Sequence, residues 1–119
     1  IYFKVISNFK LPFKKSSIDL IYSNDFIEHL HPDDLIIHLL EVKRVLKRGG
    51  LYFFWTPGGP GGPWDITSVF YPRNKGFKSL GLHLKEYCFN DLINICRDLG
   101  FKKITLPDLT KEVFMIVEN

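Results

Sequence analysis

The stretch PDDLIIHLLEVKRVLKRGGLYFFWT, residues 32–56, joins a helical pattern directly to a strand pattern. Pro32 and the two aspartates after it suit the first turn of a helix, where proline and acidic groups are favoured. Apolar residues then follow at spacings of four, three and four, which predicts one apolar helix face: Leu35, Leu39, Val42 and Leu46. Gly49 and Gly50 are expected to end this helix, and residues 51–56 form a continuous apolar strand.

A second apolar run, IDLIYS at residues 18–23, precedes this helix and suits a buried strand. The order strand, helix, strand over so short a segment is a βαβ crossover, so residues 18–23 and 51–56 are expected to be parallel neighbours. Residues 1–6, IYFKVI, are predicted to form a further strand.

The C-terminal third predicts a helix followed by a hairpin. Residues 89–100 are amphipathic, with Asn90 as the expected cap and Gly100 as the stop. Residues 101–106 and 113–118 are predicted strands, and the short turn between them requires an antiparallel pair. The fold class is therefore α/β, a sheet with a C-terminal antiparallel hairpin.

Composition excludes several classes of protein. With 119 residues, 45% of them hydrophobic, the chain can bury a core of one domain or less. The net charge of +3 comes from scattered lysines and arginines, so nucleic-acid binding is not expected. No apolar run reaches the length of a membrane span. Cys88 and Cys96 form no CxxC pair and suit reduced residues of a cytoplasmic protein.

The segment SNDFIEHLHPDD, residues 23–34, concentrates histidines and carboxylates. His29 and His31 are two residues apart, which puts them on different faces of a helix, whereas zinc enzymes favour i, i+4 pairs. The acidic groups that follow serve the helix start, so no metal site is expected. The loop PGGPGGPWD at residues 57–65 lacks the lysine and the helix that a phosphate loop requires.

Polar residues gather where the predicted parallel strands end. Ser23 and Asn24 end one strand and Thr56 ends the next, while Ser7 and Asn8 follow residues 1–6. Ligands of open α/β sheets bind beyond the carboxyl ends of such strands. A small molecule could dock at this edge, although strand-end turns are also polar without any ligand.

Three further candidates lie in or after the glycine-rich loop: Asp65, Tyr71 and His83. Loops above a rigid sheet often carry the groups that recognise a substrate. His83 and Glu86 form either a catalytic base pair or a solvated surface pair, and the sequence does not choose between them.

The segment LPFKKSSIDLIYSNDFIEHLHPDDLIIHLLEVKRVLKRGGLYFFWTP, residues 11–57, resembles the second half of class I S-adenosylmethionine-dependent methyltransferases. That family has an LPF…SFDLV segment, an EHL turn, a helix ending in RVLKPGG and a strand ending in TP. EVKRVLKRGG is the most specific part here, with Arg48 in place of the usual proline. The later GPWDIT…HLKEYCFNDL…LGF also resembles one subgroup.

The resemblance implies a partial Rossmann-like sheet. The family order is 3-2-1-4-5-7-6 with strand 7 antiparallel, and the five predicted strands resemble strands 3, 4, 5, 6 and 7 in turn. The family's GxGxG loop and the acidic residue after strand 2 have no counterpart here. Residues 1–119 are therefore expected to be a single incomplete methyltransferase domain, cut near Ile1.

The resemblance further implies a cofactor, S-adenosylmethionine, and residues that would contact it. Asn8 matches a position near the adenine, with Phe9 beside it, and Ser23 and Asn24 match the strand end alongside the methionine portion. His29 of the EHL turn would lie near the methyl group and is the expected catalytic base, ahead of Asp65 and His83.

The expected function is methyl transfer to a small-molecule, sugar or lipid-precursor acceptor by a fragment of the full enzyme. The alternative is a non-catalytic remnant or a fragment that binds a partner through an exposed sheet edge. A metal-dependent hydrolase centred on His29 and His31 is a third reading, which lacks the usual spacing. The acceptor, the methylated atom and the oligomeric state are not determined by the sequence.

Overall fold

The computed structural model describes residues 3, 5–6, 9–57, 83, 85–105 and 112–119. In chain order its elements are β1 (Ile18–Asn24), the 3-10 helix η1 (Ile27–His29), α1 (Pro32–Val45), β2 (Leu46–Pro57), α3 (Phe89–Asp98), β3 (Lys103–Thr105) and β4 (Glu112–Glu118). Neither α-helix of this described part has the length and apolar character needed to cross a membrane.

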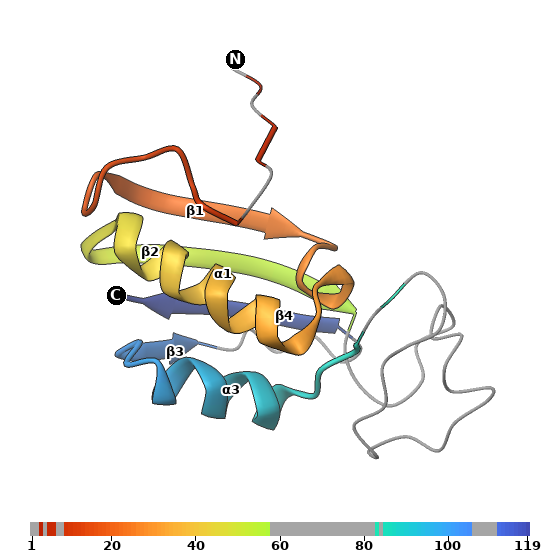
Figure 1. The fold of residues 1–119 in the computed structure, drawn as a ribbon. Helices are drawn as coiled ribbons and strands as arrows, with labels where there is room; N and C mark the ends of the chain where they lie inside the picture. Colours follow the sequence, from red (N-terminus) through yellow and green to blue (C-terminus); the bar gives the residue numbers. More distant parts are fainter. Residues whose placement is uncertain (1–2, 4, 7–8, 58–82, 84, 106–111) are drawn as a thin grey trace, which may run out of the picture.

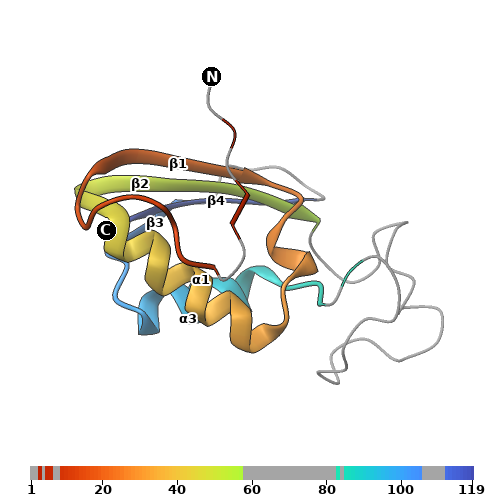
Figure 2. The same cartoon turned by 45° about the horizontal axis from the view of Figure 1, so that its top comes forward.

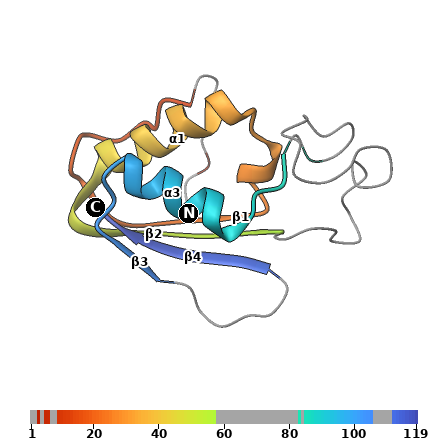
Figure 3. The ribbon, with the colours of Figure 1, turned by 90° about the horizontal axis from the view of Figure 1, so that it is seen from below.

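The four strands form one mixed sheet in the order β1-β2-β4-β3 (Figure 1). β1 and β2 are parallel, as the βαβ pattern predicts, and β4 is antiparallel to both β2 and β3. This order equals 4-5-7-6 in the family numbering, so the expected α/β class and terminal hairpin are confirmed. Both α-helices lie on the same face of the sheet (Figures 2 and 3).

The core lies between the two helices and the sheet. Leu35, Leu39 and Val42 of α1 are fully buried, as their helical spacing predicts. They share the core with residues of the sheet and of α3: Tyr52, Phe54 and Val117 from the sheet, and Leu92 and Cys96 from α3. The cysteines are both free, and burial raises the pKa of the Cys96 thiol to about 12, so this thiol is a packing group.

Helix α1 ends earlier than its apolar pattern predicts. It stops at Val45, and Leu46 already pairs with Ile18 as the first residue of β2. The prediction that Gly49 and Gly50 end the helix is therefore wrong, because Leu46 pairs with β1 and the backbone of Gly49 and Gly50 bonds to that of Asn119 in place of a further helical turn. Leu46 is nevertheless buried, as its place in the pattern required.

Gly50 is required by a close approach of two strands. A Cβ atom at this position would lie 2.9 Å from the carbonyl oxygen of Lys47 and 3.1 Å from that of Ile18. Both contacts are with backbone, which cannot move aside as a flexible side chain can. The absence of a side chain thus allows β2 to pass beside the start of β1.

Helix α3 begins and ends close to the predicted residues. Its N-cap is Cys88 and not Asn90, which lies inside the first turn, so the predicted cap is wrong by two residues. Gly100 has φ of +79° and its N–H donates to the carbonyl of Arg97 at 2.8 Å. This left-handed residue ends the helix, as predicted.

Residues 1–6 do not form the predicted strand where the structure describes them. Phe3, Val5 and Ile6 lie outside the sheet, and the first two are each 94% exposed. None of the described strands pairs with the outer edge of β1. An apolar run becomes a strand only where another strand satisfies its backbone groups, so pattern alone overestimates strand content here.

The segment before β1 is held by the charged side of α1. Arg44 and Glu41 form an ion pair with an N–O distance of 2.6 Å, and this hydrogen bond holds the pKa of the Glu41 carboxyl below its usual range. Glu41 also accepts from the N–H of Leu11, while Arg44 donates to the carbonyls of Leu11 and Phe13. These contacts order a loop that has no regular structure of its own.

The opposite face of the sheet carries no helix in the described part of the chain, although it has apolar side chains. Leu20 and Tyr22 of β1 are 60% and 58% exposed, and Leu51 of β2 lies beside Leu20 in the register. The ring of Tyr22 contacts that of Phe53 with a centroid distance of 5.4 Å. This face therefore also presents apolar side chains, but no helix of the described part covers them.

Two neighbouring leucines of α1 test this arrangement. Leu39 is 1% exposed and Leu40 is 50% exposed. Leu39→Ala is expected to lower the free energy of unfolding by about 2–5 kcal/mol, because it leaves a cavity under the sheet. Leu40→Ala should change it by no more than about 0.5 kcal/mol. Urea denaturation of both variants measures the difference, and equal losses would contradict the packing described.

Candidate functional site

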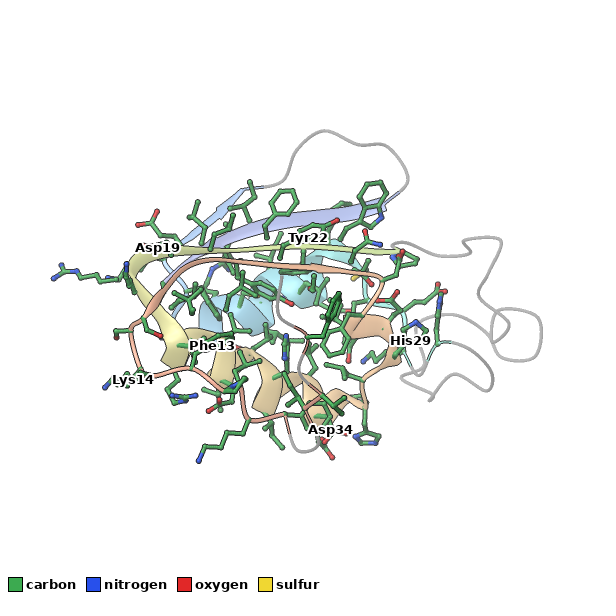
Figure 4. All side chains as sticks on the ribbon, turned by 90° about the horizontal axis from the view of Figure 1, so that it is seen from above. Phe13, Lys14, Asp19, Tyr22, His29 and Asp34 are labelled. Atoms are coloured by element: carbon green, nitrogen blue, oxygen red, sulfur yellow. The ribbon has the colours of Figure 1, made fainter. Side chains whose placement is uncertain are left out.

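The candidate site lies at the carboxyl ends of β1 and β2, where the chain leaves β1 and turns into η1. Asn24 is the last residue of β1 and pairs with Trp55 of β2. The next residue, Asp25, has φ of +46° and its N–H still donates to the carbonyl of Trp55 at 3.0 Å. Figure 4 shows His29 at this end of the sheet and Asp19 at the other.

Ser23 and Asn24 point to opposite faces of the sheet, because successive residues of a strand alternate. Ser23 is half-buried on the helix side, where its Oγ lies 2.7 Å from the hydroxyl of Tyr52. Asn24 is exposed on the other side, where its Nδ2 donates to Asp25 Oδ2 at 2.7 Å and its Oδ1 accepts from Tyr22 at 3.2 Å. The two predicted cofactor residues thus offer different surfaces to a ligand.

A buried polar chain extends from Ser23 to the middle of α1. His38 Nε2 lies 3.1 Å from the Tyr52 hydroxyl, which therefore joins Ser23 and His38. A hydroxyl has one proton, so Tyr52 donates to one neighbour and accepts from the other. Burial lowers the pKa of His38 to about 4 and raises that of Tyr52 well above its usual value, so both groups are neutral near pH 7.

Glu28 is a fully buried carboxylate in η1. Its Oε2 accepts a hydrogen bond of 2.8 Å from the hydroxyl of Thr56, which is also fully buried at the end of β2. The backbone carbonyl of Glu28 accepts from the N–H of Lys85 at 3.1 Å. Within the described residues, Glu28 Oε1 has no hydrogen-bond partner. Burying a carboxylate oxygen without a hydrogen-bond donor lowers the stability of the fold, so this atom is a candidate contact for a ligand.

His29 and His83 are far apart in sequence and adjacent in the structure. Their rings meet edge to face with centroids 5.1 Å apart, and His29 Nε2 lies 3.9 Å from Glu28 Oε1. His83 Nδ1 lies 2.9 Å from Glu86 Oε1, and the two side chains are 10% and 8% exposed. Of the two readings of this pair left open by the sequence, the solvated surface pair is wrong.

The structure describes five of the eight residues predicted for the site. Ser23, Asn24, His29 and His83 lie at or beside the strand ends, as described above. Phe9 has φ of +55° and packs half-buried against the core. The other three candidates lie outside the described residues: Asn8, Asp65 and Tyr71.

Several polar residues at the site were not among the predicted ones. Glu28, Tyr52 and His38 carry no prediction from the sequence alone. Signals for the latter two were present in the sequence: Tyr52 alternates with the inward-facing Phe54, and His38 follows Leu35 by three residues on the same helix face. No pattern pairs Glu28 with Thr56, because that contact depends on the sheet.

The hydrogen bond between Thr56 and Glu28 is expected to stabilise the fold. Thr56→Val keeps the shape of the side chain but leaves a second oxygen of Glu28 without a donor, which should cost about 2–3 kcal/mol of unfolding free energy. Thr56→Ser keeps the hydroxyl and should cost only about 1 kcal/mol for the lost methyl group. Urea denaturation compares the two variants; a valine variant as stable as the serine variant would contradict the role of the bond.

The buried imidazole of His38 makes stability depend on pH. Above its ordinary pKa of 6.5 both the folded and unfolded states hold a neutral ring, so stability is complete. As the pH falls from 6.5 to 4, only the unfolded chain takes up this proton, and stability falls by roughly 3 kcal/mol in total.

The variant His38→Gln tests this dependence, because it can keep the bond to Tyr52 but does not titrate. We expect a shallower loss of unfolding free energy between pH 6.5 and 4 than in the unmodified protein. Leu39→Ala serves as the control, since it destabilises the fold without removing a titratable group. Equal pH slopes for the His38→Gln variant and the unmodified protein would show that His38 is not the group responsible.

Residues 2–54 match the model of a family described as a methyltransferase domain. This segment contains β1, η1, α1 and most of β2, so it includes the end of β1, whereas Trp55 and Thr56 at the end of β2 lie beyond it. No curated protein sequence gives a significant match to the chain.

Solved structures of methyltransferases have the same fold. The chain is 15% identical to a SAM-dependent methyltransferase from Archaeoglobus fulgidus, with a TM-score of 0.66 over 90% of this chain and 62% of that one. It is 17% identical to a SAM-dependent methyltransferase from Methanosarcina mazei, with a TM-score of 0.64 over 97% of this chain and 64% of that one. It is 13% identical to the Burkholderia thailandensis 1,6-didemethyltoxoflavin-N1-methyltransferase, with a TM-score of 0.64 over 93% of this chain and 48% of that one. That structure was solved with bound 1,6-didemethyltoxoflavin and S-adenosylhomocysteine.

The chain spans less than two thirds of the length of each of these three structures. The family match over residues 2–54 and the shared fold agree with the resemblance to class I S-adenosylmethionine-dependent methyltransferases that the sequence indicates.

Proposed function

We propose that this protein takes part in the transfer of a methyl group from S-adenosylmethionine to a small-molecule acceptor. The observation that carries the proposal is the family match over residues 2–54, which covers the end of β1 with Ser23 and Asn24, and η1 with His29. The solved neighbour that holds S-adenosylhomocysteine together with a small molecule supports the same class of cofactor and acceptor. A fold alone does not establish chemistry, so the proposal depends on the residues of the site.

The polar side chains at the end of β1 fit the polar part of such a cofactor. Asn24 and Asp25 are exposed and present amide and carboxylate oxygens, which accept hydrogen bonds from an ammonium group. Ser23 Oγ has a lone pair beyond its contact with Tyr52, and the half-buried ring of Phe9 offers an apolar surface. Asn8, Phe9, Ser23 and Asn24 are the residues that we expect to hold the cofactor.

When bound, S-adenosylmethionine supplies an activated methyl group on a sulfonium centre. The protein's contribution is to orient the acceptor and to remove its proton where the acceptor is a hydroxyl or an amine. The side chain of His29 is 44% exposed at the strand ends, so a substrate can reach it. We propose that His29 accepts this proton and that His83, beside it, helps to position the ring.

The residues expected to select the acceptor are Asp65, Tyr71 and His83. The absence of a cationic stripe in the sequence supports a small-molecule acceptor over a nucleic acid. The two free cysteines suit a reducing compartment, and we propose the cytoplasm as the site of action.

Calorimetric titration with S-adenosylhomocysteine and transfer of a labelled methyl group to a panel of hydroxyl and amine compounds test the proposal. Binding together with transfer to at least one compound is the expected result. The variant His29→Asn should bind the cofactor product as before and lose about 10²–10⁴-fold in kcat, because only the proton acceptor is removed.

His31→Asn is the matched control. His31 caps α1 by accepting from the N–H of Asp33, and asparagine is a good N-cap, so this variant should keep its activity. Absence of S-adenosylhomocysteine binding by the folded protein would overturn the proposal and favour a non-catalytic role. Undiminished kcat in the His29→Asn variant would remove His29 from the mechanism.

A further inference from the structure

We propose that Glu28, His29 and His83 form a binding site for a divalent cation of the kind that prefers imidazole nitrogen, such as Zn²⁺ or Co²⁺. One ligand atom from each residue lies within 4.8 Å of the other two. Glu28 and His29 are adjacent in η1, whereas His83 comes from a segment more than fifty residues later. Three possible ligands from two separate segments therefore meet at one point.

The Glu28 side chain is already positioned for a ligand. It is 0% exposed, and the hydrogen bond from Thr56 to Oε2 fixes the orientation of the carboxylate. Oε1 lies 3.9 Å from His29 Nε2 and has no hydrogen-bond partner in the described part of the chain. This oxygen is fully buried, has no hydrogen-bond donor and lies beside an imidazole, so a bound cation would satisfy it.

His83 is oriented by a carboxylate of its own. Its Nδ1 lies 2.9 Å from Glu86 Oε1, in a pair that is almost wholly buried. In the tautomer whose Nδ1 donates to Glu86, Nε2 carries the lone pair that can bind a metal ion. A carboxylate that accepts from one ring nitrogen while the other binds the metal is the usual support of a histidine ligand.

The three groups suit a four-coordinate ion with one open position. Two histidines and one glutamate are a known ligand set of catalytic zinc, with the fourth position taken by water or substrate. At bond lengths of about 2.1 Å, two ligands of a tetrahedral ion lie about 3.4 Å apart. The present spacing thus requires only that the side chains move slightly inward, and the partly exposed ring of His29 leaves a route for entry.

This inference revises the expectation of no metal site, which rested on the spacing of His29 and His31. His31 is not part of the cluster, because its Nδ1 accepts from Asp33 at the start of α1. The cation site goes beyond the proposed methyl transfer and does not depend on it. A His29 that binds an ion through one nitrogen cannot accept a proton, so the ion-bound state would lack the proposed base.

Calorimetric titration of the metal-free protein with Zn²⁺, and absorption spectroscopy with Co²⁺, test the site without cofactor or acceptor. We expect one ion per chain and the visible d–d bands of a low-coordinate Co²⁺ ion. His29→Asn and His83→Asn should each weaken binding by more than about 100-fold, and Glu86→Ala by about 10- to 100-fold, since it removes only the support of His83.

His31→Asn is again the matched control and should bind as tightly as the unmodified protein. Absence of binding, unchanged affinity in both ligand variants, or an equal loss in the His31→Asn variant would each overturn the proposal. Circular dichroism checks that the variants fold.

A measurement on the unmodified protein decides the matter if the variants do not fold. Zn²⁺ should protect His29, but not His31, from modification by diethyl pyrocarbonate. Equal modification of His29 with and without the ion would contradict the site. Because no step of these tests uses S-adenosylmethionine, their failure leaves the proposed methyl transfer untouched.

Discussion

The parallel pairing of β1 with β2 is the constraint on which the rest of the structure depends. Two parallel strands need a crossover, and α1 supplies it by burying Leu39 and Val42 against the sheet. The same pairing brings the carboxyl ends of both strands to one edge, where η1 follows β1 directly. The contact of Glu28 with Thr56, and all that surrounds it, exists because these two ends are neighbours.

Near this edge the inner face of the sheet changes from apolar to polar packing. Tyr52 lies in the core, yet its hydroxyl joins Ser23 to His38, and both rings are neutral because burial opposes charge. Further along, Glu28 places a carboxylate in the same layer. Such groups add little net stability when they are satisfied and cost much when they are not. These groups gather at one end of the sheet, where the candidate site lies.

The sequence predicted the elements better than their ends. Helical spacing identified the buried face of α1, and the short hairpin connection required β3 and β4 to be antiparallel. The helix nevertheless ended at Val45, since pairing of Leu46 with Ile18 competes with the next helical turn. Residues 3, 5 and 6 lay outside the sheet despite their apolar run, because a strand needs a partner that no local pattern specifies.

The sequence by itself determined the α/β class, the parallel strand pair and the antiparallel hairpin, since these follow from hydrophobic periodicity and connection length, while a local segment around residues 11–57 indicated the strand order through a family resemblance. It also placed Ser23 and His29 near strand ends. Only the tertiary structure decided that His29 meets His83, that Glu86 lies buried beside it, and that Glu28 is fully enclosed. The physical reason is that periodicity reports which side of an element is buried, whereas contacts between distant segments arise when the sheet and helices pack together.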